Sequence, residues 1–237
     1  MDETYPDHKP LALLLPGLDG TGRLFYRQIE ALAERYRVTP WAYAPGGDFT
    51  LSDLIRDLGR ETEGEAPHSI LVIAESFGGL VALKYVLQYP ERVRHLVLVN
   101  SFPYCRRRLR IRLACILVGF LRFAFGRRIK DFVVDQALLR EGILAEDRRR
   151  YREVVKQVDL PDYRRRLQLV QETDLRPQLG KITATTVLLA AGRDKLVPSV
   201  ADAHLMAARI ANAQMHEFPD AGHALLLTPG FSLADYV

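Results

Sequence analysis

Short apolar segments alternate along this chain with longer segments whose apolar residues recur at helical spacing. Near-continuous apolar runs of this kind are typical of parallel strands that are covered on both faces. The strands predicted in this way cover residues 11–15, 70–74, 96–99 and 186–190, with weaker candidates at 37–41 and 214–218. The predicted helices cover residues 24–36, 51–60, 77–88 and 200–210. Such alternation predicts an α/β protein in which helices wrap a parallel sheet.

Residues 105–184 break this alternation. They contain no convincing strand, and they contain helical patches such as 113–125 and 148–158. An insertion of this kind between two strands predicts a helical lid or cap over the carboxyl edge of the sheet, where open α/β sheets bind ligands. The expected division is a core made of residues 1–104 and 185–237, with a lid over residues 105–184.

The charge is also uneven. The predicted lid, residues 105–184, contains 20 basic and 10 acidic residues, whereas the rest of the chain contains 13 basic and 19 acidic residues. Together they give the net charge of +4. Peripheral contact of this basic lid with an anionic membrane is therefore an alternative to an ordinary solvated surface. We expect no nucleic-acid partner, because arginine runs such as 106–108 lack interleaved aromatic residues and a recognition motif.

The segment 113–125 is apolar except for Arg122. Its thirteen residues are too few for a membrane span, which needs about 20. It is either a helix packed on the core or an apolar wall for an acyl group. Under the second interpretation, Leu117 and Phe120 are candidate substrate-binding residues.

The polar, acidic N-terminus does not resemble an export signal. Only two cysteines occur, Cys105 and Cys115, and on one helix they would lie about 15 Å apart, too far for a disulfide. We expect reduced thiols and a cytoplasmic location.

The strongest chemical signal follows the strand predicted at 70–74. The sequence Ala74-Glu75-Ser76-Phe77-Gly78 matches the G-x-S-x-G nucleophile elbow, with Ala in the first position. The elbow is a sharp strand-to-helix turn that needs small flanking residues and exposes the serine hydroxyl at the sheet edge. The motif therefore predicts Ser76 as the nucleophile, at the N-terminus of a helix whose free N–H groups favour negative charge.

A glycine-rich loop follows the first strand. Pro16–Gly22 contains three glycines in six residues, which lets its backbone approach a ligand closely. In serine hydrolases with this elbow, one oxyanion donor is the N–H after the nucleophile and the second comes from such a loop. This assigns the N–H groups of Phe77 and Leu18, with Gly17 and Asp19 as further candidates for substrate contact. The spacing of a phosphate-binding G-x-x-x-x-G-K-[ST] loop is missing.

A serine hydroxyl needs a positioned base. Among six histidines, His223 alone lies in a flexible turn after the last predicted strand, from which it can lean over the sheet edge. Asp194 follows the strand at 186–190 and is placed to orient the imidazole. The chain order Ser76, Asp194, His223 is the order of the α/β-hydrolase triad.

With these motifs, the sequence resembles the α/β-hydrolase superfamily over nearly all of its length outside the lid. The segments PGLDGTG and AESFGG are similar to those of small bacterial hydrolases and of the hydrolase-like part of plant phytyl ester synthases. The resemblance implies an α/β-hydrolase fold with the triad and oxyanion donors named above. Two departures are Pro16-Gly17 in place of the usual His-Gly, and too few residues before Leu11 for an N-terminal hairpin, which implies a sheet of about six strands.

The predicted activity is hydrolysis of a small-molecule carboxylic ester through an acyl-enzyme on Ser76. No metal or other cofactor is implied, because no cluster of His, Cys and carboxylate residues has ligand spacing. One alternative is an acyltransferase that passes the same acyl group to an alcohol. Another is a catalytically inactive binding module on the same fold, which the intact Ser76, Asp194 and His223 argue against.

Overall fold

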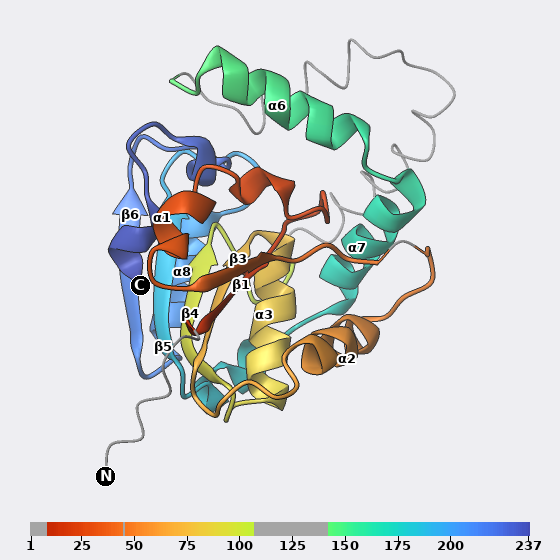
Figure 1. Ribbon diagram of the computed structural model, residues 1–237, viewed down its shortest axis with the longest axis vertical. Coiled ribbons are helices and arrows are strands. Elements are labelled where there is room, and N and C mark those ends of the chain that lie inside the picture. The colour runs from red at the N-terminus through yellow and green to blue at the C-terminus, as the bar shows by residue number, and fades with distance from the viewer. Residues whose placement is uncertain (1–8, 45, 107–141) are drawn as a thin grey trace.

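The computed structural model describes residues 9–44, 46–106 and 142–237 (Figure 1). Six strands form one parallel sheet in the order β2-β1-β3-β4-β5-β6. Their bounds are β1 Leu11–Leu15, β2 Arg37–Pro40, β3 Ile70–Glu75, β4 Val93–Val99, β5 Thr185–Ala191 and β6 Ala213–Phe218. The predicted parallel sheet of about six strands is therefore confirmed, and both weaker candidates are strands.

Both faces of this sheet are buried. Successive residues of β1 alternate between two hydrophobic clusters: Leu11, Leu13 and Leu15 belong to one, Ala12 and Leu14 to the other. The pleat of a strand sends neighbouring side chains to opposite faces, so a central strand that is covered on both must be apolar throughout. This explains why the central strands appear in the sequence as unbroken apolar runs.

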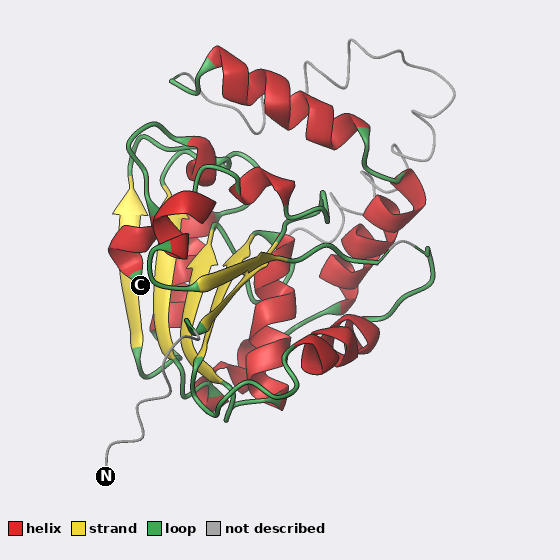
Figure 2. Ribbon diagram, viewed as in Figure 1, coloured by secondary structure: helices red, strands yellow, loops and turns green. Residues whose placement is uncertain are grey.

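Helices cover the two faces, as Figure 2 shows in red. Residues of α2, α3 and α8 contribute to the first cluster, whereas α1 and the short 3₁₀ helices η3 and η4 contribute to the second. The α-helices of the core are α1 Ile29–Ala33, α2 Leu51–Glu61, α3 Phe77–Gln88 and α8 Ser199–Ala207. The 3₁₀ helices are η1 Arg23–Phe25, η2 Arg176–Lys181, η3 Leu225–Leu227 and η4 Leu233–Tyr236.

The helix predicted over residues 24–36 is wrong in extent, because only η1 and the five residues of α1 are helical there. The buried side chain of Gln28 lies between the two helices. Its amide donates to the Leu226 carbonyl at 2.8 Å, and its carbonyl accepts from the Leu233 N–H at 2.8 Å. These bonds to the C-terminal segment, about 200 residues away along the chain, fix a turn at a position where local periodicity predicts a helix.

The described part of the predicted lid holds two α-helices and no strand. α6 (Ala145–Lys156) lies over the edge at which the strands end, and α7 (Leu160–Glu172) descends beside α3 (Figure 1). Leu169 and Val170 of α7 belong to the first hydrophobic cluster of the core. The predicted helix 113–125, including Cys115, lies outside the described residues.

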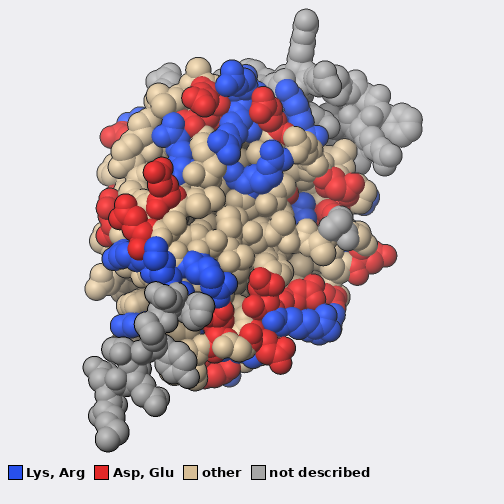
Figure 3. All heavy atoms as spheres, viewed as in Figure 1, with Lys and Arg blue, Asp and Glu red and all other residues tan. Residues whose placement is uncertain are grey.

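The surface of α6 is strongly basic. Figure 3 shows Lys and Arg side chains gathered at the upper end of the view, where Figure 1 places this helix, and Arg149, Arg150 and Lys156 are exposed on it. Within the described ranges, no helix has both the length and the apolar composition that crossing a bilayer requires.

Candidate active site

The predicted nucleophile lies at a sharp turn between β3 and α3. Ser76 has φ +53° and ψ −117°, a conformation that non-glycine residues rarely adopt. Its side chain is buried, and its N–H donates to the Val99 carbonyl at 2.9 Å, which ties the turn to the end of β4. A strained residue between a buried strand and a helix is what the elbow motif predicts.

The two glycines that follow are required by close packing. A Cβ added to Gly78 would lie 2.7 Å from the Pro16 carbonyl oxygen and closer still to that of Leu15, so α3 and β1 meet with no room for a side chain. A Cβ on Gly79 would overlap the side chain of Ser101. The glycines of AESFGG therefore let the elbow lie directly against the start of the glycine-rich loop Pro16–Gly22, which we call the oxyanion loop after its predicted role.

The predicted acid and base meet in the structure. His223 Nδ1 and Asp194 Oδ2 are 2.7 Å apart, and both side chains are buried. Asp194 also accepts hydrogen bonds from the N–H groups of Leu196 and Val197, at 2.9 and 3.0 Å, and from the Ser199 hydroxyl. Because Nδ1 faces the carboxylate, Nε2 is the ring nitrogen left to take a proton.

Electrostatics favour a charged form of this pair. Burial by itself would raise the pKa of Asp194, but the His223 charge and the hydrogen bonds to His223 and Ser199 bring it below its ordinary value. For His223, burial acts to lower the pKa, and the Asp194 carboxylate outweighs it, so the pKa of the imidazole is raised. The Asp194 carboxylate therefore favours the protonated form of the His223 imidazole.

Asn100 joins the predicted base to the predicted nucleophile, and it is not among the site residues predicted from the sequence. It follows β4, is buried, and has φ +46°. Its amide nitrogen donates to the His223 carbonyl at 2.8 Å, while its oxygen accepts from the Ala191 N–H at 2.8 Å. Since Ser76 is bonded to the preceding residue, Val99, a short path links the elbow to the His223 loop. An Asn directly after a buried strand was the available signal.

The Ser76 hydroxyl makes no hydrogen bond to the His223 imidazole within the described residues.

An apolar cluster lies next to the His223 loop: Tyr151 and Val154 of α6 pack with Leu24 of η1 and with Ala224, the residue after His223. α6 thus covers the carboxyl edge between the oxyanion loop and the His223 loop.

Both predicted oxyanion donors are unpaired. In the described chain, neither the Leu18 N–H nor the Phe77 N–H donates to another protein group. The Gly17 carbonyl accepts from the Gly20 N–H at 3.1 Å, and because a peptide is planar and trans, the Leu18 N–H on the same peptide must point the opposite way. Gly17 lies against the nucleophile, since a Cβ added there would be 3.6 Å from Ser76 Cβ.

The remaining substrate-binding candidates differ in outcome. The Asp19 carboxylate accepts from the N–H and hydroxyl of Thr21, at 2.9 and 2.6 Å, and so stabilises the turn of the loop. Leu117 and Phe120 lie outside the described residues.

A second carboxylate lies next to the nucleophile. Glu75 is buried, and burial raises its pKa to about 7, while the charge of His223 acts to lower it. The sequence placed Glu75 only as the variable residue of the elbow, and its burial could not be inferred from the motif.

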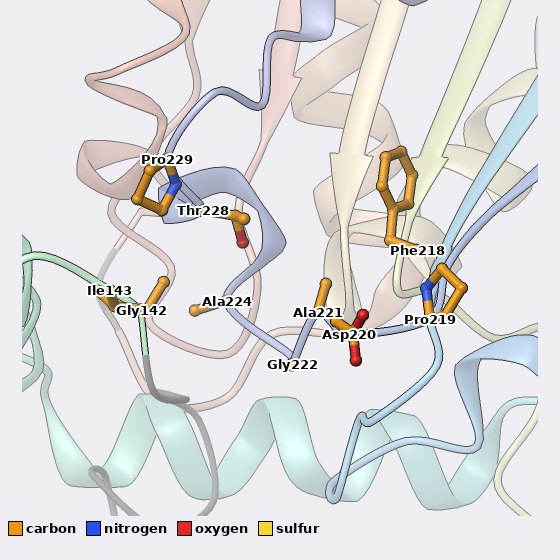
Figure 4. A pocket seen from close by; sticks show the side chains of 10 residues that line it. All are labelled: Gly142, Ile143, Phe218, Pro219, Asp220, Ala221, Gly222, Ala224, Thr228 and Pro229. Atoms are coloured by element: carbon orange, nitrogen blue, oxygen red, sulfur yellow. The ribbon is translucent and has the colours of Figure 1, made fainter.

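The His223 loop also borders a hollow of about 360 Å³. Figure 4 shows Ile143, from the segment leading to α6, facing Ala224 and Pro229 across it. Ala221, Gly222 and Ala224 line it and flank His223 along the chain, and most of the exposed lining is apolar. Space for an apolar group therefore exists beside the predicted base.

No set of three or more His, Cys, Asp or Glu residues in the described ranges is arranged to hold a metal ion. The groups that the fold does bring together are a strained serine, a buried His–Asp pair and two unpaired N–H donors. Such a set can activate a hydroxyl and stabilise an oxyanion, which is the chemistry of acyl transfer.

Comparison with known proteins agrees with this geometry. A family model described as the alpha/beta hydrolase family matches residues 12–235. A protein of Serratia proteamaculans named "Putative carbamate hydrolase RutD" is 26% identical over 233 residues, which cover 92% of this chain and 86% of that protein. A 1-acylglycerol-3-phosphate O-acyltransferase of Arabidopsis thaliana is 31% identical over 104 residues, 39% of this chain and 25% of the acyltransferase.

Among solved structures, the esterase EaEST from Exiguobacterium antarcticum superposes with a TM-score of 0.79 at 17% identity, covering 93% of this chain and 87% of the esterase. A likeness at this level of identity establishes the fold.

Proposed function

The chain belongs to the alpha/beta hydrolase family, and from that premise we propose that it is a serine hydrolase that cleaves carboxylic esters through an acyl-enzyme on Ser76. The observation that carries the proposal is the His223–Asp194 hydrogen bond of 2.7 Å, held beside the elbow by Asn100. A loop that only connects two elements needs neither a buried imidazole with a fixed Nδ1 partner nor a strained serine with two unpaired N–H groups. Their presence therefore supports a catalytic role.

In the first half-reaction, Ser76 Oγ attacks the ester carbonyl carbon and its proton passes to His223 Nε2. The carbonyl oxygen becomes an oxyanion that accepts from the N–H groups of Leu18 and Phe77. The intermediate collapses, the bond to the alcohol oxygen breaks, and Nε2 returns the proton to the leaving alcohol. The hydrogen bond between Ser76 and His223 forms with substrate bound, since such catalytic bonds are often long or unmade in an empty site.

In the second half-reaction, water attacks the acyl carbon while His223 Nε2 takes its proton. The Ser76 ester bond breaks, Ser76 Oγ recovers the proton, and a carboxylic acid leaves. Each oxyanion donor is expected to contribute about 10²–10³ in kcat. The apolar lining of the hollow beside His223 supports an apolar group in the substrate.

Steady-state hydrolysis of p-nitrophenyl esters with acyl chains of two to about twelve carbons tests this proposal directly. We expect turnover by the wild-type protein and a loss of at least about 10⁴-fold in Ser76→Ala. Ser232→Ala, which changes a serine near the C-terminus far along the chain from the elbow, is the matched control and should retain full activity. Equal activity of Ser76→Ala and wild type would contradict the mechanism.

The Arabidopsis relative favours a second candidate, an acyltransferase that uses the same acyl-enzyme with an alcohol in place of water. Product analysis in the presence of a long-chain alcohol separates the two activities. A new ester formed at the expense of free acid, and abolished in Ser76→Ala, would establish transfer. Free acid alone would leave hydrolysis as the activity. Because the Serratia relative is named a putative carbamate hydrolase, a carbamate should be tested as a substrate beside the esters.

A further inference from the structure

The carbonyl groups of the oxyanion loop are held by a continuous set of hydrogen bonds. Five successive carbonyls, from Pro16 to Gly20, each have an identified donor. The Tyr43 hydroxyl donates to Pro16 at 3.0 Å and the Tyr43 N–H donates to Gly20 at 3.0 Å. The Gly17 carbonyl accepts from within the loop, as described above. The carbonyls of Leu18 and Asp19 are left for a donor from elsewhere.

That donor is Arg166, which lies on α7 in the predicted lid. Its Nε donates to the Leu18 carbonyl at 2.9 Å and its Nη2 to the Asp19 carbonyl at 3.4 Å. The residue is only 3% exposed. Arg166 forms no ion pair with any described residue; the carboxylates of Asp162 and Asp19 act on its charge from a longer distance, and its hydrogen bonds go to the loop backbone.

The loop is shaped to receive this side chain. Gly20 has φ +75°, and a Cβ added there would lie 2.7 Å from Arg166 Nη1 and 2.8 Å from Cζ. The guanidinium therefore occupies the space that any other residue at position 20 would fill. Tyr43 lies next to it, with its ring centroid 6.0 Å from Arg166 Cζ. Tyr43 also contacts the ring of Phe77, the residue that carries the other oxyanion donor, with centroids 5.6 Å apart.

We propose that Arg166 is a positioning residue for catalysis: from the lid helix α7, it holds the peptides after Leu18 so that the Leu18 N–H points at the oxyanion. This role rests on the proposed function, because it presumes that an oxyanion forms on the Ser76 side of the loop. The lid segment then does more than cover the site, since one of its helices completes the oxyanion hole.

The proposed role predicts an effect on kcat rather than on KM. An oxyanion donor makes its strongest bond when charge has developed, so misplacing it weakens the transition state more than the substrate complex. With Arg166 removed, the carbonyls of Leu18 and Asp19 lose their donors, and the Leu18 N–H is held in direction only by the bond between the Gly17 carbonyl and the Gly20 N–H. The expected loss is smaller than that for deleting an oxyanion donor outright.

The test compares Arg166→Met with Arg165→Met. Arg165 is the neighbouring arginine on α7 and also donates through Nε to a backbone carbonyl, that of Phe49 at 2.7 Å, away from the oxyanion loop. We expect Arg166→Met to lower kcat for ester hydrolysis about 10- to 100-fold, with KM within about threefold of wild type. Arg165→Met should keep kcat within about threefold. A similar kcat in both variants would overturn the proposal.

Hydrogen–deuterium exchange supplies a readout that does not depend on activity. Amides of residues 17–22 should exchange faster in Arg166→Met and at the wild-type rate in Arg165→Met. If wild type has no Ser76-dependent esterase activity while this exchange difference is seen, the proposed function fails and the structural part of the inference stands. Unchanged exchange in Arg166→Met overturns the inference whatever the activity.

Loss of a buried guanidinium also lowers stability, so Arg166→Lys provides a second variant. It keeps the positive charge and can donate a hydrogen bond to one of the two loop carbonyls. We expect its kcat to lie between those of wild type and Arg166→Met, again at unchanged KM. A wild-type kcat in Arg166→Lys together with unfolding of Arg166→Met, monitored by circular dichroism, would overturn the positioning role and leave a purely structural one.

Discussion

The two halves of the site are held in place in different ways. The predicted nucleophile and base are held by the ends of β4 and β5: the Ser76 N–H donates to Val99, and Asn100 bonds both to Ala191 and to the loop of His223. The oxyanion loop is held by residues outside the strands, Tyr43 in the segment after β2 and Arg166 on α7. One half depends on the sheet itself, and the other depends on a helix that belongs to the predicted lid.

This difference separates what the core fixes from what the lid segment fixes. The ends of β4 and β5 anchor the elbow and the His223 loop through the bonds of Val99 and Asn100, so the positions of Ser76 and His223 depend on the core of the fold. Under the proposed role of Arg166, the direction of the Leu18 N–H depends on the position of α7. A change in the lid helix can therefore alter the rate of the chemical step without touching the nucleophile. The variants below probe this contrast from the largest expected effect to the smallest.

Asp194→Asn should have the largest effect, on the half held by the sheet. The amide cannot stabilise the imidazolium, so we expect kcat to fall by about 10³–10⁴-fold. In wild type the raised pKa of His223 places the acid limb of kcat/KM above about pH 6.5, because activity is lost as the pH falls through that pKa and the imidazole becomes protonated. In Asp194→Asn this limb should move to lower pH. A limb that stays at the wild-type pH would contradict the pairing of Asp194 with the catalytic base.

Gly78→Ala tests whether the elbow is fixed by its local packing. The added Cβ would meet the backbone carbonyls of Leu15 and Pro16, which cannot move without shifting β1. We expect the free energy of unfolding to fall by about 3 kcal/mol and kcat to fall about 100-fold. Gly180→Ala is the control, since its Cβ would lie at an ordinary contact distance of 3.6 Å from the carbonyl oxygen of Arg209. Denaturant unfolding and ester hydrolysis of the two variants decide the matter: equal values for both would refute the packing argument.

Tyr43→Phe removes one hydrogen bond from the oxyanion loop and leaves Arg166 in place. The Pro16 carbonyl loses its donor, which costs about 1 kcal/mol, and we expect kcat to fall about threefold to tenfold at unchanged KM. The matched change is Tyr85→Phe. It removes a buried hydroxyl on α3, nine residues after Ser76, that forms a hydrogen bond of 2.7 Å with the Thr62 hydroxyl. Kinetics that are equally impaired in both variants would show that the loop carbonyl has no special role.

Asp147→Asn tests the other lid helix and should have the smallest effect on the chemistry. Asp147 of α6 is buried and forms an ion pair with Arg27 at 2.6 Å, and it also accepts from the Tyr26 hydroxyl. Because Arg27 is one-third exposed, we expect a loss of about 1 kcal/mol of stability and a kcat within about threefold of wild type. Limited proteolysis should show faster cleavage within α6. A fall in kcat as large as that of Arg166→Met would remove the distinction between α6 and α7.

The sheet could be predicted from the sequence because its strands are buried on both faces. Leu11–Leu15 is predicted with its exact bounds, and the other strands differ at their ends by one to three residues. The helix over 24–36 could not be predicted correctly, because the buried Gln28 is held by residues about 200 positions later. Local periodicity carries no information about such contacts.

The same limit applies to the site. Ser76, Asp194 and His223 could be identified because each follows a strand, and strand ends of a parallel sheet meet at one edge. Arg166 could not be identified, since it is one of three consecutive arginines on a polar helix and only the fold brings it to Leu18. Glu75 and Asn100 were visible at strand ends, but their burial and partners depend on the packed structure.

The central claim is that Ser76 is the nucleophile, and covalent labelling tests it most directly. A p-nitrophenyl alkylphosphonate should release p-nitrophenol as Ser76 Oγ displaces it at phosphorus, leaving one phosphonyl group per chain. Intact-mass and peptide mass spectrometry should place this group on the peptide that contains Ser76, with none in Ser76→Ala and slow labelling in Arg166→Met. A label on another residue, or equal labelling of wild type and Ser76→Ala, would contradict the account.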